Sequence, residues 1–187
     1  MGKDDNRDEL NAAASCGRVY WVTGLPGSGK TTLALALAER LLGCRRSVVQ
    51  LDGDRMRAVL GGRYGYSQGD RRALASIYGR FCKELAGQGH DVVCATVSMF
   101  HEVRAWNRGH IGDYCEIYLR APIDLLVHRH PRGLYARGLG GHIRNVPGVD
   151  MAFEEPEAPD LMLDAGQSAE RVVADLFHFL DSRKEAA

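Results

Sequence analysis

Apolar runs alternate along the chain with stretches of helical periodicity. Short apolar runs, typical of strands buried on both faces, predict strands at residues 18–24, 47–52, 91–98, 114–120 and 160–164. Longer stretches with an apolar residue at every third or fourth position predict helices at residues 30–43, 70–89, 122–129 and 168–183. Gly43 as a stop, Pro122 in a first turn and Ser168 as an N-cap support three of these boundaries. This alternation predicts an α/β fold with a mostly parallel sheet and helices on both faces.

The stretch from residue 131 to residue 159 lacks a clear period and contains four prolines. A loop of this length inside a compact domain usually serves a function, so we expect a lid at about 131–159. The chain has 187 residues, which favours a single domain over residues 18–187. Residues 1–17 are polar and acidic, so we expect a disordered tail there and no signal peptide.

Composition narrows the range of partners. Lys+Arg and Asp+Glu both total 24, so the chain lacks the basic surplus of a general nucleic-acid binder. No apolar run approaches the roughly 18 residues of a membrane span. Five cysteines occur without a C-x-x-C pair, as expected for idle thiols in a reducing compartment. We therefore expect a cytoplasmic protein without nucleic-acid or membrane partners.

The segment "GLPGSGKTT" matches the phosphate-binding pattern G-x-x-x-x-G-K-[ST] and lies between a predicted strand and a predicted helix. Backbone N–H groups of such a loop and the following helix N-terminus form a cradle for phosphate. Lys30 would reach the β- and γ-phosphates, and the Thr31 hydroxyl would bind Mg²⁺. The predicted fold is therefore a P-loop NTPase-type three-layer sandwich. The residues expected to bind the nucleotide are Gly24, Gly27, Ser28, Gly29, Lys30, Thr31 and Thr32.

Two carboxylates, Asp52 and Asp54, follow the second predicted strand in "LDGD". At the carboxyl end of a strand near a phosphate loop, they could orient Mg²⁺ and accept a proton from a hydroxyl. Asp-Gly-Asp is also a common turn, so the pattern alone leaves both readings open. No N-K-x-D motif for guanine is present, which favours a kinase over a GTPase.

Further motifs resemble the adenylyl-sulfate kinase (APS kinase) family, whose members phosphorylate the 3′-hydroxyl of adenosine 5′-phosphosulfate (APS). The resemblance runs from Val19 to about Asp164 and rests on "GLPGSGKTT", "LDGDRMR", "YGYSQGDR", "VSMF", "RHPRGLYARGLGGHIRNVPGVDMAFEEP" and "PDLMLD". It implies ATP and Mg²⁺ as cofactors, a role in sulfate assimilation and a homodimer.

The resemblance also implies roles for single residues. Asp54, Lys30 and Ser98 would be catalytic, and Thr31 and Asp54 would hold the metal. Arg129 and Arg132 would belong to a lid over ATP. The acceptor site would comprise Asp52, Arg57, Tyr66, Arg71, Val97, Ser98, Asn145 and Val146. Without the family, Arg57 and Arg71 are better interpreted as solvated helix residues and Tyr66 as a packed aromatic. The Trp106–Arg108 stretch has no assigned role.

Departures from the family pattern cluster on the acceptor side. Leu74, Ser76 and Ile77 stand where the family has an Asn and paired Arg, and Val146 replaces an aromatic that stacks on the base. Stacking on a base contributes roughly 1–3 kcal/mol, enough to change which base is preferred. Two alternatives to APS therefore stay open: a CDP-linked acceptor such as cytidine diphosphoramidate, and a non-catalytic module that binds nucleotide for a partner.

Overall fold

The computed structural model describes residues 16–98, 100–130 and 132–185. Most of the expected N-terminal tail, residues 1–15, lies outside this range, as do Met99 and Pro131. The described part begins just before the first strand, where the N–H of Gly17 donates to the carbonyl oxygen of Ala86 at 2.9 Å.

In the described part of the chain, five parallel strands form one sheet in the order β2-β3-β1-β4-β5. All five predicted strands are present. Their bounds are β1 Val19–Thr23, β2 Val48–Asp52, β3 Asp91–Thr96, β4 Tyr114–Arg120 and β5 Leu161–Asp164. Since β1 lies between β3 and β4, the chain leaves it at the point where the strand order reverses, which is where ligands bind in such sheets.

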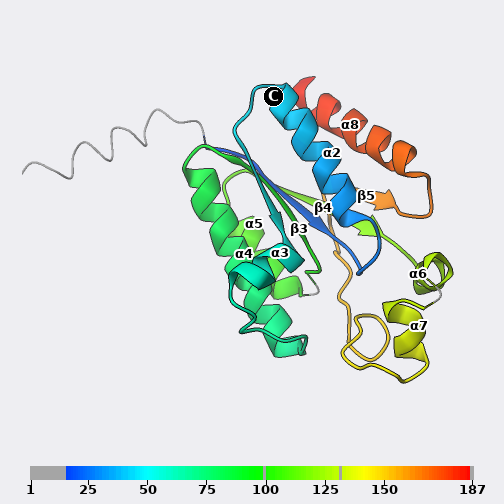
Figure 1. Ribbon diagram of the computed structural model, residues 1–187. Helices are drawn as coiled ribbons and strands as arrows, with labels where there is room; N and C mark the ends of the chain where they lie inside the picture. Colours follow the sequence, from blue (N-terminus) through cyan, green and yellow to red (C-terminus); the bar gives the residue numbers. More distant parts are fainter. Residues whose placement is uncertain (1–15, 99, 131, 186–187) are drawn as a thin grey trace, which may run out of the picture.

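Helices cover both faces of this sheet, as the alternation predicted (Figure 1). On one face lie α2 Lys30–Gly43 and α8 Ala169–Glu185, and on the other α4 Gln68–Gly87 and α5 His101–His110. Side chains of β1 alternate between the two cores: Tyr20 and Val22 join the α2 side, whereas Val19 and Trp21 join the α4 side. Because successive side chains of a strand point to opposite faces of the sheet, β1 contributes to both cores.

Three helices were not predicted as such: α3 Gly53–Val59, α5, and α7 Leu134–Leu139 within the expected lid. The predicted helix at 122–129 is α6 Ile123–Arg129. α3 and α7 have seven and six residues, too few for a recognisable period, and neither is directly preceded by a proline such as Pro122, which marks the start of α6. α5 buries Val103 together with the polar residues Arg104 and Asn107, so its buried face does not read as apolar. None of the helices in the described part has the length and apolar character needed to cross a bilayer.

A buried charged network anchors α5 to the sheet. Nε of Arg104 lies 3.3 Å from a carboxylate oxygen of Glu116 on β4, and both side chains are 5% exposed. Arg104 also donates to the carbonyl oxygens of Ser98 and Glu154, both at 2.8 Å. Arg108 bridges Glu116 and Asp160. This network ties the turn after β3 to the segment that leads into β5, and it accounts for part of the unassigned Trp106–Arg108 stretch.

Candidate active site

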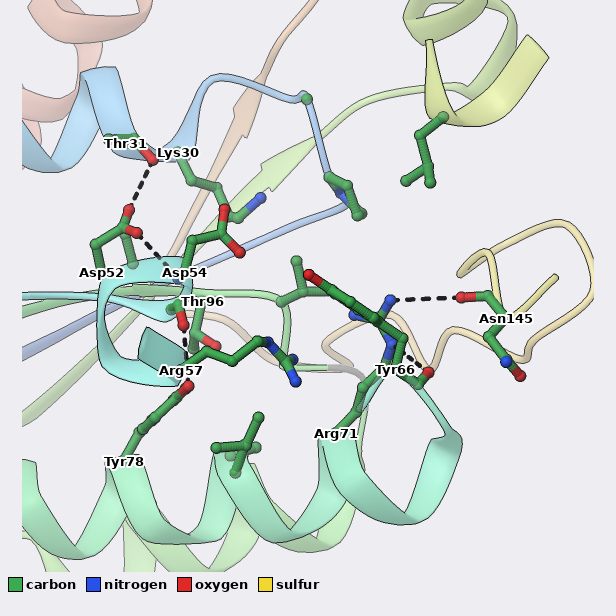
Figure 2. Close-up of a pocket in the computed structure, with 18 of the residues that line it drawn as sticks. Lys30, Thr31, Asp52, Asp54, Arg57, Tyr66, Arg71, Tyr78, Thr96 and Asn145 are labelled. Carbon is green, nitrogen blue, oxygen red and sulfur yellow. Dashed lines mark hydrogen bonds between the residues drawn. The ribbon is translucent and has the colours of Figure 1, made fainter. Parts of the chain in front are cut away.

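A cavity of about 630 Å³ opens at the carboxyl ends of the strands (Figure 2). It extends from the phosphate loop, across the start of α3 and the inner face of α4, to the segment after α7. The lining residues are Pro26, Gly27, Gly29, Lys30, Thr31, Thr32, Asp52, Gly53, Asp54, Arg57, Tyr66, Arg71, Leu74, Ala75, Tyr78, Ala95, Thr96, Val97, Leu134, Ile143, Arg144 and Asn145. Most of the expected nucleotide and acceptor residues therefore share one space.

The phosphate loop has the backbone that its glycines predict. Gly29 adopts φ 104° immediately before α2, a conformation that L side chains rarely adopt. At Gly24 (φ 152°) a Cβ would also collide with the carbonyl oxygen of Leu119 on the neighbouring strand. The loop and the first residues of α2 line the cavity, and the free N–H groups of a helix N-terminus favour an anion there.

Lys30 is the cation of this loop. Its side chain is almost fully buried, and its ammonium donates to the carbonyl oxygen of Leu25 at 2.8 Å. Burial lowers the pKa of Lys30 from 10.5 to about 8, although the carboxylates of Asp54 and Asp52 act in the opposite direction. Figure 2 shows the Lys30 ammonium and the Asp54 carboxylate turned toward the same space. A phosphate arriving there would meet a partly desolvated positive charge.

Asp52 and Asp54 differ in what they contact. Asp52 caps α3, since its carboxylate accepts from the N–H groups of Asp54 at 3.0 Å and Arg55 at 3.3 Å. Its second oxygen accepts from the hydroxyl of Thr31 at 2.9 Å. Asp54 is in the first turn of α3 and lines the cavity with its carboxylate exposed. Asp54 is therefore the carboxylate better placed to meet a substrate.

The donor set fits a triphosphate with Mg²⁺. Ser28 in the phosphate loop is buried, and its hydroxyl has no hydrogen-bond partner among the described residues. Within the same part of the chain, no three His, Cys, Asp or Glu side chains are grouped to hold a metal by themselves. Magnesium commonly takes one or two carboxylates and completes its shell with water and phosphate oxygens. Thr31 with Asp54 or Asp52 supplies oxygen ligands of that kind.

The acceptor end of the cavity is built by α3, α4 and the loop between them. Arg57 comes from the last turn of α3, and Arg71 from the first turns of α4. Further along α4, Leu74 and Tyr78 face the same space, because residues three and four apart share a helix face. The Tyr78 hydroxyl donates to the carbonyl oxygen of Gly53 at 3.0 Å, which links α4 to the start of α3.

Several expected site residues are not brought to the cavity, judged on the described lining. Val146 is fully buried and packs in the core against Gly138, so it does not take the place of a stacking aromatic. Ser98 is also fully buried; its hydroxyl is unpartnered among the described atoms, and only its neighbour Val97 lines the cavity. Arg129 donates to the carbonyl oxygen of Ala165 and points elsewhere.

The remaining expected residues divide in the same way. Gly24 and Ser28 belong to the phosphate loop but are not among the described lining residues. Arg132 is an exposed residue of the segment before α7 and is also absent from that lining. Conversely, sequence reasoning missed three lining residues of the expected lid, Leu134, Ile143 and Arg144. Leu134 lies in the motif "GLYARG", and Ile143 and Arg144 lie in "HIRNV", but nothing in one sequence separates side chains that face a cavity from side chains that face solvent.

The parallel sheet in this strand order and the phosphate loop at its reversal point, faced by an exposed carboxylate, together define a P-loop phosphotransferase. The family model for adenylylsulphate kinase matches residues 16–164. The chain therefore belongs to the adenylyl-sulfate kinase family, and it is an enzyme.

Individual relatives agree with this assignment. The chain is 41% identical over 146 residues to the cytidine diphosphoramidate kinase of Campylobacter jejuni, covering 78% of this chain and 85% of the relative. It is 39% identical over 151 residues to a probable adenylyl-sulfate kinase of Bacillus subtilis, covering 80% and 77%. The structure of the Mycobacterium tuberculosis APS kinase CysC in complex with AMPPNP and APS superposes with a TM-score of 0.80 at 31% identity, covering 88% of this chain and 98% of that one.

Proposed function

We propose that this kinase transfers the γ-phosphoryl group of ATP to the 3′-hydroxyl of adenosine 5′-phosphosulfate, a step of sulfate activation. The observation that carries the proposal is the set of residues that line this cavity. A phosphate loop with Lys30 lies at one end, Asp54 in the middle, and the paired arginines Arg57 and Arg71 at the other. This order of charged groups fits a nucleotide acceptor whose anionic 5′-group lies at the two arginines. Its sugar hydroxyl would then point toward a triphosphate at the phosphate loop.

At the donor end, the loop N–H groups and Lys30 would bind the phosphates of ATP, and Thr31 and Asp54 would hold Mg²⁺. The metal would neutralise charge on the β- and γ-phosphates. Lys30 is positioned for charge that develops on the phosphoryl oxygens, where a preorganised, desolvated cation is most effective. Thr31 receives its orientation from Asp52, the residue that also caps α3.

At the reacting centre, Asp54 would orient the acceptor hydroxyl and accept its proton. The bond between the γ-phosphorus and the bridging oxygen breaks to leave ADP while the sugar oxygen bonds to phosphorus, in line and without a covalent enzyme intermediate. Arg144, a lid arginine that lines the cavity, would add positive charge over the transferred group. In this proposal Arg144 takes the part that Arg129 and Arg132 were expected to play.

A second acceptor is favoured by specific differences in this chain. Leu74, which lines the cavity, stands where the family pattern has Asn, and Val146 is buried where the pattern has an aromatic. The Campylobacter jejuni relative is named a cytidine diphosphoramidate kinase. A cytidine diphosphate derivative with the same 3′-hydroxyl chemistry is therefore the alternative substrate, since a pyrimidine needs less stacking surface.

Acceptor-dependent ADP release tests both candidates. The purified chain with ATP and Mg²⁺ is supplied with adenosine 5′-phosphosulfate or cytidine diphosphoramidate, and kcat/KM is compared. A preference for the first supports the proposal, and a preference for the second selects the alternative. ATP binding without turnover of either acceptor would contradict the proposed reaction and favour a nucleotide-binding module.

We further propose that the protein is a homodimer, as the family resemblance implies. Light scattering coupled to size exclusion measures the mass directly: a value near twice 20.6 kDa supports the dimer, and a value near 20.6 kDa contradicts it.

A further inference from the structure

Two guanidinium groups share one aromatic ring at the acceptor end of the cavity. Cζ of Arg57 lies 4.5 Å from the centroid of the Tyr66 ring, and Cζ of Arg71 lies 5.3 Å from it. The arginines belong to different helices, α3 and α4, and the tyrosine lies on the loop that joins them. Figure 2 shows the three side chains gathered at this end, away from Lys30 and the phosphate loop.

Such a gathering of like charges requires compensation. Arg57 donates to the carbonyl oxygens of Tyr64, at 2.8 Å, and Gly65. Arg71 donates to the carbonyl oxygens of Tyr66 at 3.1 Å and Asn145 at 3.4 Å. The pKa of Arg71 is lowered, first by burial and then by the charge of Arg57, so a positive potential remains at this point. The carbonyls and the ring face hold the two cations without neutralising them.

The tyrosine ring has no place in the core. Its residue is 57% exposed, whereas Tyr78 on the same side of the cavity is 2% exposed. Its ring lies against the two guanidinium groups, and a cation over an aromatic face is attracted to the ring quadrupole. Both hydrogen bonds that Arg57 makes among the described atoms come from Nη1, which leaves its Nη2 donors for an oxyanion.

We infer that Tyr66 is a positioning residue that holds Arg57 and Arg71 together as a paired receptor for the anionic 5′-group of the acceptor. This inference rests on the proposed function and refines it. The family resemblance assigns Tyr66 to stacking on the acceptor base; here the guanidinium groups already lie over its ring. The ligand class is then a nucleotide whose 5′-substituent carries two adjacent negative charges, and Tyr66 does not discriminate between bases.

The two roles of Tyr66 predict different dependences on the acceptor. A ring that stacks on the base should matter more for adenine than for cytosine, and should matter even for a nucleoside without a 5′-anion. A ring that pairs arginines should matter equally for both bases, and only when the anion is present. The base and the 5′-group of the acceptor can be varied independently, so the two roles can be separated.

The experiment measures ADP release by the full chain for wild type, Tyr66→Leu and Tyr66→Phe. The acceptors are adenosine 5′-phosphosulfate, cytidine diphosphoramidate, adenosine and cytidine. We expect Tyr66→Leu to raise KM for both anionic acceptors about tenfold, by the same factor for each base, with KM for ATP unchanged. We expect no change for the two nucleosides, and Tyr66→Phe should restore the wild-type KM because it keeps the ring.

Phe81→Leu is the matched control, since Phe81 is an exposed aromatic of α4 outside the described lining of the cavity. A loss in Tyr66→Leu that is several times larger for the adenine acceptor, or that persists with adenosine, would overturn the pairing.

If wild type turns over neither anionic acceptor, the proposed reaction fails on its own. Calorimetric binding of adenosine and cytidine 5′-monophosphate to the ADP-saturated chain then decides the pairing. Equal weakening of both by Tyr66→Leu supports it, and unequal weakening or no binding to wild type overturns it.

Discussion

The burial of the Lys30 ammonium should lower the free energy of unfolding of the protein without nucleotide. Its pKa falls from an ordinary 10.5 to about 8 in the folded protein. At 1.36 kcal/mol per pKa unit, the protonated lysine destabilises the fold by about 3 kcal/mol. Replacing Lys30 also removes its hydrogen bond to the Leu25 carbonyl oxygen, and this loss lowers the stability of the variant by about 1 kcal/mol. Lys30→Met, which keeps the length and removes the charge, should therefore gain about 2 kcal/mol at pH 7.

The sign of the pH dependence follows from the same shift. Lys30 is a base whose pKa is lower in the folded than in the unfolded protein, so between about pH 8 and 10.5 the unfolded chain binds more protons. The stability of the wild type should rise through that window as the lysine loses its proton. The advantage of Lys30→Met should be full below pH 8 and should disappear by about pH 10.

Urea unfolding followed by tryptophan fluorescence at pH 7, 8, 9 and 10 measures this difference, and other titrating groups cancel between the two proteins. For a chain of this length, 2 kcal/mol corresponds to about 4–8 °C in Tm. Lys83→Met, on the exposed face of α4, is the matched control and should show no such pH dependence. A Lys30→Met variant that is less stable than wild type at pH 7, or whose advantage is the same at pH 7 and pH 10, would show that the buried charge of Lys30 does not destabilise the fold.

Three further substitutions test other parts of the structure. Asp54→Asn should keep ATP affinity but lower turnover by about 100-fold or more, measured by ADP release, since the amide cannot accept the hydroxyl proton; unchanged turnover would remove Asp54 from that role. Arg104→Met should lower the free energy of unfolding by about 3 kcal/mol, because it leaves the buried Glu116 carboxylate poorly compensated. Adding Glu116→Leu should recover most of that loss, and a single variant as stable as wild type would contradict the account. Ser98→Ala replaces a buried hydroxyl that lacks a partner among the described atoms, so urea unfolding and turnover should both stay near wild type; complete loss of turnover would instead support a catalytic serine.

Local patterns were sufficient for most of the sheet. All five predicted strands appear within two residues of their predicted ends, because strands buried on both faces are read directly as apolar runs. The helix expected at 70–89 is α4, which begins two residues earlier, at Gln68. Ser67 caps it by accepting from the N–H of Asp70 at 3.2 Å, and this capping residue stands three positions before the predicted start of the helix. Helix α5 escaped because its buried face carries Arg104 and Asn107, whose partners lie elsewhere in the chain.

The sequence by itself determined the backbone of the phosphate loop. Gly24, Gly29, Lys30 and Thr31 lie within eight consecutive residues, and a short motif specifies the local geometry that joins β1 to α2. Only the tertiary structure decided the acceptor end. There Arg57, Tyr66 and Arg71 are joined to a segment more than 70 residues away, through Arg71 and the Asn145 carbonyl. The tertiary structure also places Val146 and Ser98 outside the described lining of the cavity. Which side chain faces a cavity and which faces the core depends on packing between distant segments, and a single sequence carries no record of that packing.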